Sequence, residues 1–96
     1  MSATDASVSC WVLYLLECHG GTYYAGITNN LAKRLQAHQE GRGARYTRAR
    51  RPRRLLGYRE FADRSEASKA EWAIKQLPRR SKLAFLRVRE EVAHDR

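Results

Sequence analysis

The segment from residue 11 to residue 18 constrains the fold more than any other part of the chain, because nearly all of its residues are apolar. A run this short and this apolar is typical of a strand that other elements cover on both faces. His19-Gly20-Gly21 supplies a turn, and residues 22–27 are rich in aromatic and β-branched side chains. The sequence therefore predicts a β-hairpin in the interior of a domain.

Capping residues, glycine and proline divide the rest of the chain into further elements. The predicted elements are a helix capped by Asn29 or Asn30 that runs to about residue 40, a loop over 41–54, a strand over 54–61, a helix that follows Asp63 and runs to about residue 77, and a helix over about 79–93. The order β-β-α-β-α-α predicts an α+β fold, in which helices flank a small three-stranded antiparallel sheet.

The length of 96 residues favours one domain, because a chain of this size can bury a single modest core. We expect residues 10–93 to form this domain and residues 1–9, which are small and polar, to form a flexible tail. Cys10 and Cys18 flank one predicted strand, so they are too far apart to form a disulfide and should be reduced. Without a membrane span or a signal peptide, a cytoplasmic protein is expected.

The charge of the chain points to a polyanionic partner. Nineteen Lys and Arg against ten Asp and Glu give a net charge of +9, and an excess of this size in a folded domain usually indicates nucleic acid. Seven arginines and no acid lie in residues 41–54. From this segment and its surroundings we predict phosphate contacts by Lys33, Arg42, Arg45, Arg48, Arg50, Arg51 and Arg53. A solvated charged loop is the alternative, and Tyr46 could either stack on an unpaired base or fix the loop in place.

Two predicted helices place polar side chains on the face that should meet the sheet. At 100° per residue, Arg34 and His38 fall on the apolar stripe of the first helix, and Glu71 falls on that of the second. Burying an unpaired charge costs several kcal/mol, so these groups should be paired, bound to a ligand or placed in a cleft. An internal Arg34–Glu71 ion pair and a cleft site that contains both residues are the two alternatives.

Tyrosines on the predicted hairpin favour the cleft. Tyr14 and Tyr24 are ten residues apart across a short turn, so they can lie on neighbouring strands. Each alone could be an ordinary buried tyrosine with one hydrogen-bond partner. Near Glu71, we expect Lys75 to be an i,i+4 ion-pair partner, and Trp72 to pack against the last helix or the first strand.

At these residues the sequence resembles the GIY-YIG nuclease superfamily, over about residues 11–77. The two signature triplets correspond to Val12-Leu13-Tyr14 and Tyr24-Ala25-Gly26, and the helical arginine, the following His or Tyr and the metal-ligand glutamate of the family correspond to Arg34, His38 and Glu71. The first triplet lacks its Gly and the second has Ala in place of Ile. The small stand-alone bacterial members, called YhbQ-like, are more similar to this chain than the N-terminal nuclease domain of UvrC.

The resemblance implies a divalent-metal-dependent endonuclease that hydrolyses phosphodiester bonds in DNA, with a role in repair or recombination. Glu71 would hold one Mg²⁺ or Mn²⁺ ion, Tyr14 would take a proton from the attacking water, and Arg34 would bind the phosphate. Tyr24 and His38 would position water or phosphate, or His38 would relay protons. Because the pKa of a phenol is near 10, this role for Tyr14 requires a site that favours its phenolate.

Two other functions fit the same resemblance. The chain could be a nucleic-acid-binding module that keeps the scaffold with little or no catalysis. It could also be a nuclease subunit that takes its specificity from a protein partner, because no second DNA-binding domain follows in the sequence. A monomer or a weak dimer is expected, without a membrane association.

Overall fold

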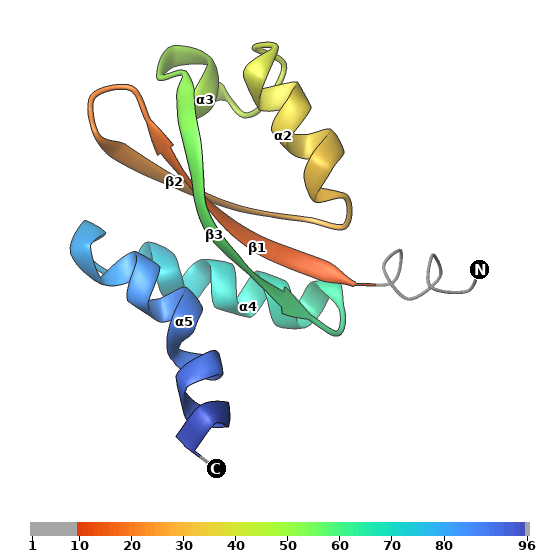
Figure 1. The fold of residues 1–96 in the computed structure, drawn as a ribbon. Helices are drawn as coiled ribbons and strands as arrows, with labels where there is room; N and C mark the ends of the chain where they lie inside the picture. The colour runs from red at the N-terminus through yellow and green to blue at the C-terminus, as the bar shows by residue number, and fades with distance from the viewer. Residues whose placement is uncertain (1–9, 96) are drawn as a thin grey trace.

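A computed structural model describes residues 10–95, so the expected tail at residues 1–9 lies outside the described residues. The elements are β1 (Trp11–Cys18), β2 (Thr22–Thr28), α2 (Leu31–Gln39), α3 (Arg45–Ala49), β3 (Pro52–Phe61), α4 (Arg64–Lys75) and α5 (Arg79–Asp95), as Figure 1 shows. This confirms the predicted α+β fold with three strands and flanking helices. No helix of the described part is long and apolar enough to cross a membrane.

The sheet has the strand order β2-β1-β3 with antiparallel pairing throughout. The apolar run at residues 11–18 is therefore the central strand, which explains why its side chains are apolar on both faces. In the register of the hairpin, Tyr14 lies opposite Gly26, and Leu16 lies opposite Tyr24. The two tyrosines are thus diagonal neighbours on one face of the sheet.

Helices cover the two faces of the sheet separately, with α2 and α3 on one side and α4 and α5 on the other (Figure 1). Side chains of β1 alternate between these sides. Leu13 and Leu15 pack with Ile74 of α4 and Leu86 of α5. Val12, Tyr14, Leu16 and Cys18 form a second cluster with Leu31 and Leu35 of α2. Tyr14 thereby becomes a fully buried polar side chain beneath α2.

Side-chain caps begin the two helices that carry candidate site residues. The Asn30 side chain accepts a hydrogen bond from the Lys33 N–H at 3.1 Å, and the Asp63 side chain accepts one from the Glu66 N–H at 2.9 Å. These contacts confirm both predicted helix starts and satisfy amide groups that the helices leave unpaired. Past the end of α2, Gly41 has a φ of 78°, a left-handed conformation that glycine adopts readily.

The prediction of a loop over residues 41–54 is wrong in two respects. Its middle forms the short helix α3, and β3 begins at Pro52 rather than at residue 54. Thr47 of α3 is completely buried, so tertiary packing orders a segment whose sequence has no apolar periodicity. Proline is tolerated at the first residue of a strand that lies at a sheet edge.

Candidate active site

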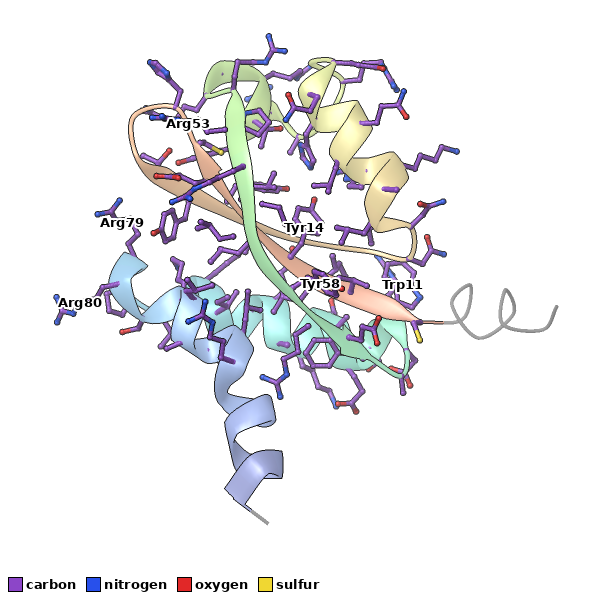
Figure 2. The ribbon with its side chains drawn as sticks, viewed as in Figure 1. Trp11, Tyr14, Arg53, Tyr58, Arg79 and Arg80 are labelled. Atoms are coloured by element: carbon purple, nitrogen blue, oxygen red, sulfur yellow. The ribbon has the colours of Figure 1, made fainter. Side chains whose placement is uncertain are left out.

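Three rings gather on the face of the sheet that α2 covers. Tyr14 lies on the central strand beneath this helix (Figure 2). The ring centroids of Tyr14 and Tyr24 are 6.3 Å apart, and that of His38 lies 5.8 Å from Tyr14 and 5.6 Å from Tyr24. The hairpin register and the position of His38 one turn after Arg34 in α2 bring these rings together, as the sequence predicted.

A hydrogen-bonded chain runs through the buried part of the site. The Tyr14 hydroxyl lies 2.9 Å from His38 Nε2, and His38 Nδ1 lies 2.7 Å from Thr47 Oγ1. The Thr47 hydroxyl in turn donates to the Ala44 carbonyl at 3.0 Å. Tyr14, His38 and Thr47 are each at most 1% exposed, so the partners in this chain replace the water that burial removes. Thr47 is a site residue that the sequence analysis missed.

Burial sets the protonation of these groups. It raises the pKa of the Tyr14 phenol, with a smaller lowering from hydrogen bonding to Arg34. Burial, followed by the charge of Arg34, lowers the pKa of His38. At neutral pH the polypeptide therefore holds a neutral phenol beside a neutral imidazole. The polypeptide by itself therefore does not supply the environment favouring the Tyr14 phenolate that this role requires, because desolvation outweighs the nearby guanidinium.

Two glycines make room for the rings. A Cβ at Gly26 would lie 2.5 Å from the Tyr14 hydroxyl oxygen, and one at Gly43 would lie 2.2 Å from His38 Nδ1. Neither approach is possible without moving the ring. Gly26 ends the second signature triplet, so its retention has a steric reason, and Gly43 brings the start of the arginine-rich segment directly against His38.

Arg34 faces the two tyrosine hydroxyls from α2. Hydrogen bonding to Tyr14, and to a lesser degree to Tyr24, raises the pKa of Arg34. Its Nε is buried without a hydrogen-bond partner. The same side chain lines a hollow of about 350 Å³ together with Thr28, Asn30, Lys33, Gln36, Ala37 and Arg42. None of these lining residues is acidic, so the hollow suits an anion.

Glu71 reaches the same region from α4. Its Oε2 lies 3.3 Å from Lys75 Nζ, and 24% of the Glu71 side chain is exposed. Lys75 Nζ is in turn 6.0 Å from the centroid of the Tyr24 ring, and the charge of Glu71 contributes to the raised pKa of Tyr14. The ion pair of Glu71 is therefore with Lys75, as the i,i+4 spacing predicted, and the alternative of an internal Arg34–Glu71 pair is wrong.

The Glu71 carboxylate suits a single hydrated cation. Among the side chains that the structure describes, residues 10–87, no three His, Cys, Asp or Glu residues cluster as metal ligands. Mg²⁺ is commonly held by only one or two carboxylates, with water and substrate phosphate as its other ligands. Glu71 already attracts the Lys75 ammonium and is partly open to solvent, so a divalent cation could take the place of that ammonium.

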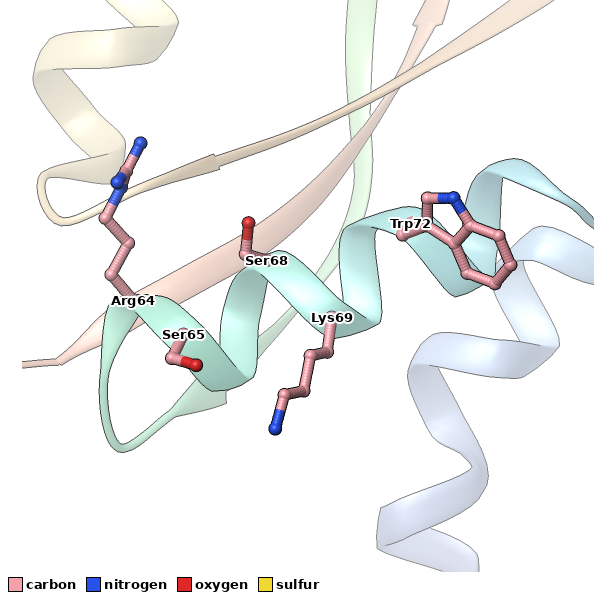
Figure 3. A pocket seen from close by; sticks show the side chains of 5 residues that line it. All are labelled: Arg64, Ser65, Ser68, Lys69 and Trp72. Atoms are coloured by element: carbon pink, nitrogen blue, oxygen red, sulfur yellow. The ribbon is translucent and has the colours of Figure 1, made fainter.

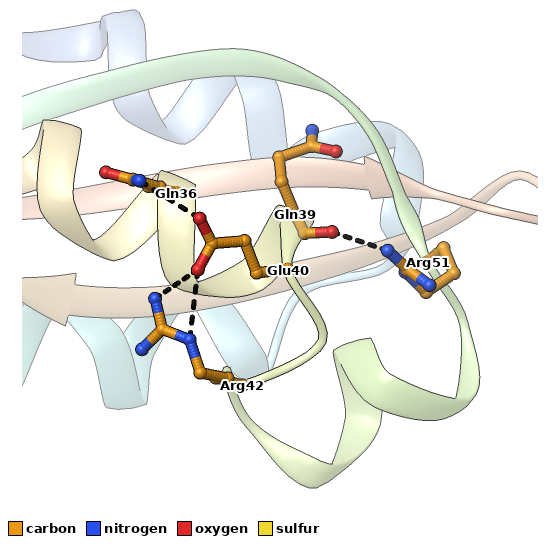
Figure 4. A network of polar contacts seen from close by, with 5 residues as sticks. All are labelled: Gln36, Gln39, Glu40, Arg42 and Arg51. Carbon is orange, nitrogen blue, oxygen red and sulfur yellow. Dashed lines mark hydrogen bonds and ion pairs between the residues drawn. The ribbon is translucent and has the colours of Figure 1, made fainter.

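The residues predicted to contact phosphate lie on one side of the site. Lys33 and Arg42 lie beside Arg34 in the hollow, whereas Arg45, Arg48, Arg50, Arg51 and Arg53 are exposed on α3 and near the start of β3. Two of these arginines are anchored locally (Figure 4): Arg42 pairs with Glu40, and Arg51 donates to the Gln39 carbonyl.

Tyr46 fixes the arginine-rich segment to the site. Its ring stacks on that of Tyr24, with centroids 5.7 Å apart and an interplanar angle of 26°, and Tyr46 is 38% exposed. Of the two roles that the sequence left open, this contact supports fixing the segment in place. The arginines of α3 are thereby held at a constant position relative to the buried rings.

The unfolding free energy is expected to fall when the pH is lowered from 7.5 to 5.5. Because the folded chain holds the pKa of His38 below its ordinary value of 6.5, the unfolded chain takes up this proton first and is stabilised by at most about 1.4 kcal/mol per pH unit. Chemical denaturation at both pH values measures the difference. His38→Gln, which lacks the titrating ring, should show a nearly constant value, and a constant value in the wild type would contradict the assignment.

Paired tyrosines on a central hairpin, a helical arginine and a carboxylate on the helix after the third strand define a class of catalytic domains. The family model described as the GIY-YIG catalytic domain matches residues 10–84. The chain therefore belongs to the GIY-YIG domain family, which confirms the resemblance seen in the sequence.

Within this family the chain is similar to bacterial UPF0213 proteins. It is 53% identical over 85 residues to one from Xanthomonas axonopodis pv. citri, covering 88% of this chain and 83% of the relative. It is 46% identical over 79 residues to one from Oceanobacillus iheyensis, covering 82% and 92%. The solution NMR structure of a UPF0213 protein from Bacillus halodurans is 40% identical, covers 76% of this chain and 78% of that chain, and has a TM-score of 0.48.

Proposed function

We propose that residues 10–93 form a divalent-metal-dependent endonuclease that hydrolyses phosphodiester bonds in DNA, in repair or recombination. The observation that carries this proposal is the buried Tyr14–His38 hydrogen bond beside two groups of opposite charge, Arg34 and Glu71, that do not neutralise each other. Membership in the GIY-YIG family supports nuclease activity as the class of reaction.

The position of each site residue suits it to one part of the hydrolysis. Arg34, which lines the hollow beside α2, donates from its guanidinium to the non-bridging phosphate oxygens. The attacking water loses a proton to the Tyr14 oxygen while Tyr14 passes its own proton to His38 Nε2, 2.9 Å away. The water oxygen forms the new bond to phosphorus while the bond to the leaving oxygen breaks, and the leaving oxygen takes up a proton from solvent to become the hydroxyl end of the cut strand. Tyr24 orients the water or the phosphate.

Glu71 is the residue that would hold Mg²⁺ or Mn²⁺, one ion in all. When bound, such an ion acts as a Lewis acid toward the phosphate. Because the pKa of Tyr14 is raised, its hydrogen bond to His38 is needed for the proton transfer. A phenol that resists ionisation can pass on a proton only if an acceptor such as His38 removes its own proton in the same step.

The affinity for DNA is expected to depend strongly on salt. If about five of the exposed arginines contact phosphates, log affinity should fall against log salt concentration with a slope of about −4. Fluorescence anisotropy between 50 and 300 mM salt measures this slope. The double variant Arg45→Ala/Arg48→Ala should make the slope shallower by about two, whereas Arg80→Ala at the start of α5 is the matched control. A flat dependence in the wild type would exclude the segment as the anchor.

A substrate panel tests the proposed activity. Purified protein is incubated with single-stranded, duplex and branched DNA and with RNA, with and without Mg²⁺ or Mn²⁺, and Glu71→Ala controls for contaminating nuclease. Metal-dependent cleavage of DNA by the wild type alone is expected. Binding of all these substrates without cleavage would support the non-catalytic module instead. Cleavage that appears only on addition of a cell extract would support the need for a protein partner.

Free Cys10 and Cys18 agree with the proposed cytoplasmic location.

A further inference from the structure

The hydroxyl of Thr47 has a single hydrogen, and its surroundings determine where that hydrogen lies. The Ala44 carbonyl, 3.0 Å from Thr47 Oγ1, can only accept a hydrogen bond. With its hydrogen used there, Oγ1 can only accept from His38 Nδ1 at 2.7 Å. The proton of the neutral imidazole then lies on Nδ1, and Nε2 is left as an acceptor for the Tyr14 hydroxyl.

We propose that Thr47 is a positioning residue that holds His38 in the tautomer able to accept a proton from Tyr14. The inference deepens the proposed function, on which its catalytic consequence rests. With the opposite tautomer, Nε2 would donate to the Tyr14 oxygen and could take no proton from it. Thr47 thus selects the direction in which the chain of hydrogen bonds can carry a proton.

The packing around His38 leaves Thr47 as the residue that holds the imidazole in this tautomer. Gly43 lies so close to Nδ1 that even a Cβ on it would clash at 2.2 Å, so this edge of the ring is closed by protein. His38 and Thr47 are 1% and 0% exposed. Because Thr47 belongs to α3, the helix that carries exposed arginines also fixes the proton acceptor of the site.

The tautomer can be measured without any cleavage. Long-range ¹H–¹⁵N correlation spectra of the ¹⁵N-labelled protein distinguish Nδ1–H from Nε2–H imidazole, and His38→Gln assigns its signals among the three histidines. We expect Nδ1–H in the wild type and in Thr47→Ser, and a shift toward Nε2–H in Thr47→Val, which keeps the shape but removes the oxygen. The cleavage rate should fall at least about tenfold in Thr47→Val and stay near wild type in Thr47→Ser.

An Nε2–H tautomer in the wild type would overturn the inference, and so would an unchanged tautomer in Thr47→Val. If Thr47→Val does not fold, the spectra of the wild type and of Thr47→Ser still show whether His38 carries its proton on Nδ1. A protein with the expected tautomer that cleaves no nucleic acid would refute the proposed function and leave the assignment of Thr47 intact.

A separate observation concerns the outer face of α4. Trp72 is 69% exposed, so the expectation that it packs against α5 or β1 is wrong. It lies at one end of a shallow hollow of about 510 Å³ (Figure 3), with Arg64 at the other end and Ser65, Ser68 and Lys69 between them. An indole this exposed leaves much of its ring open to solvent and accessible to a stacking partner.

We propose that this hollow binds an unpaired nucleotide of the nucleic-acid substrate. The Trp72 ring offers a stacking surface for a base, and two cations and two hydroxyls beside it suit the phosphates of the same strand. None of the residues that line the hollow is acidic. Base stacking on an exposed aromatic ring contributes about 1–3 kcal/mol and does not depend on sequence. Trp72 directly follows Glu71 in the chain, and its side chain leaves α4 about 100° around the helix axis from that of Glu71.

Tryptophan fluorescence tests this proposal in the absence of metal. The chain has two tryptophans, so Trp11→Phe leaves Trp72 as the only reporter. Saturation with a ten-nucleotide oligothymidine is expected to quench Trp72, and a blunt 20-base-pair duplex is expected to quench it much less. Trp72→Ala should weaken single-strand binding about five- to tenfold and duplex binding less than twofold, whereas Trp72→Phe should keep most of the affinity.

Unchanged fluorescence at saturation would overturn the proposal, as would an equal effect of Trp72→Ala on both substrates. Self-association that Trp72→Ala abolishes, seen by sedimentation, would instead assign the hollow to a second copy of the chain. These readouts are binding measurements, so their result does not depend on whether the protein cleaves its ligand.

Discussion

Glu71→Gln is expected to reduce metal-dependent DNA cleavage about a thousandfold while the protein stays folded. The substitution keeps the shape of the side chain but removes the charge that would attract the cation, and a loss of this size corresponds to about 4 kcal/mol of transition-state stabilisation. The structural cost is small, because Glu71 contributes only an i,i+4 pair with Lys75, and such pairs are worth about 0.3–0.5 kcal/mol.

Single-turnover cleavage and thermal unfolding measure both parts of this prediction. Glu66→Gln is the matched control, because Glu66 is an exposed carboxylate on the same helix. Cleavage by Glu71→Gln within about threefold of the wild type would remove Glu71 from the metal site. A folded Glu71→Gln protein without activity, next to a fully active Glu66→Gln protein, is the expected pair of results.

Tyr14→Phe is expected to lower the cleavage rate about a hundredfold or more. It removes the only atom of this side chain that can exchange a proton with the attacking water, and general acid–base groups typically contribute about 10²–10⁴ in rate. The fold should survive. Loss of the hydrogen bond to His38 Nε2 leaves one buried acceptor unpaired, which costs about 1–3 kcal/mol and lowers the melting temperature by several degrees.

Tyr58→Phe is the control for this variant. Tyr58 lies opposite Tyr14 on β3 but is 53% exposed, so loss of its hydroxyl should change neither rate nor stability. The readout is the single-turnover rate at saturating metal, together with the melting temperature. Unchanged turnover in Tyr14→Phe would exclude this hydroxyl from the reaction.

The fold was largely predictable because local signals and burial agree. The apolar run of β1, the glycine turn and the caps at Asn30 and Asp63 each determine one element. The arginine-rich segment was predicted as a loop because α3 has neither apolar periodicity nor a side-chain cap. Its order comes from tertiary contacts, namely Thr47 against His38 and Tyr46 against Tyr24, which no local pattern encodes.

The candidate site was predictable where polar residues fall on apolar faces. Tyr14, Arg34 and His38 come together because helical spacing and strand register bring them there. Thr47 is different, since a threonine among arginines has no unusual pattern. The direction of the Tyr14 pKa shift was also beyond the sequence, because it depends on how deeply the folded chain buries this side chain.

The most direct test of the account is the response of wild-type cleavage to removal and return of the metal. The protein is treated with a chelator, dialysed and assayed on the best DNA substrate before and after addition of Mg²⁺. We predict no cleavage in the chelated protein, recovery of the full rate with Mg²⁺, and no recovery in Glu71→Gln. Cleavage that persists in the chelator, or that returns equally in Glu71→Gln, would contradict a metal-dependent nuclease site at these residues.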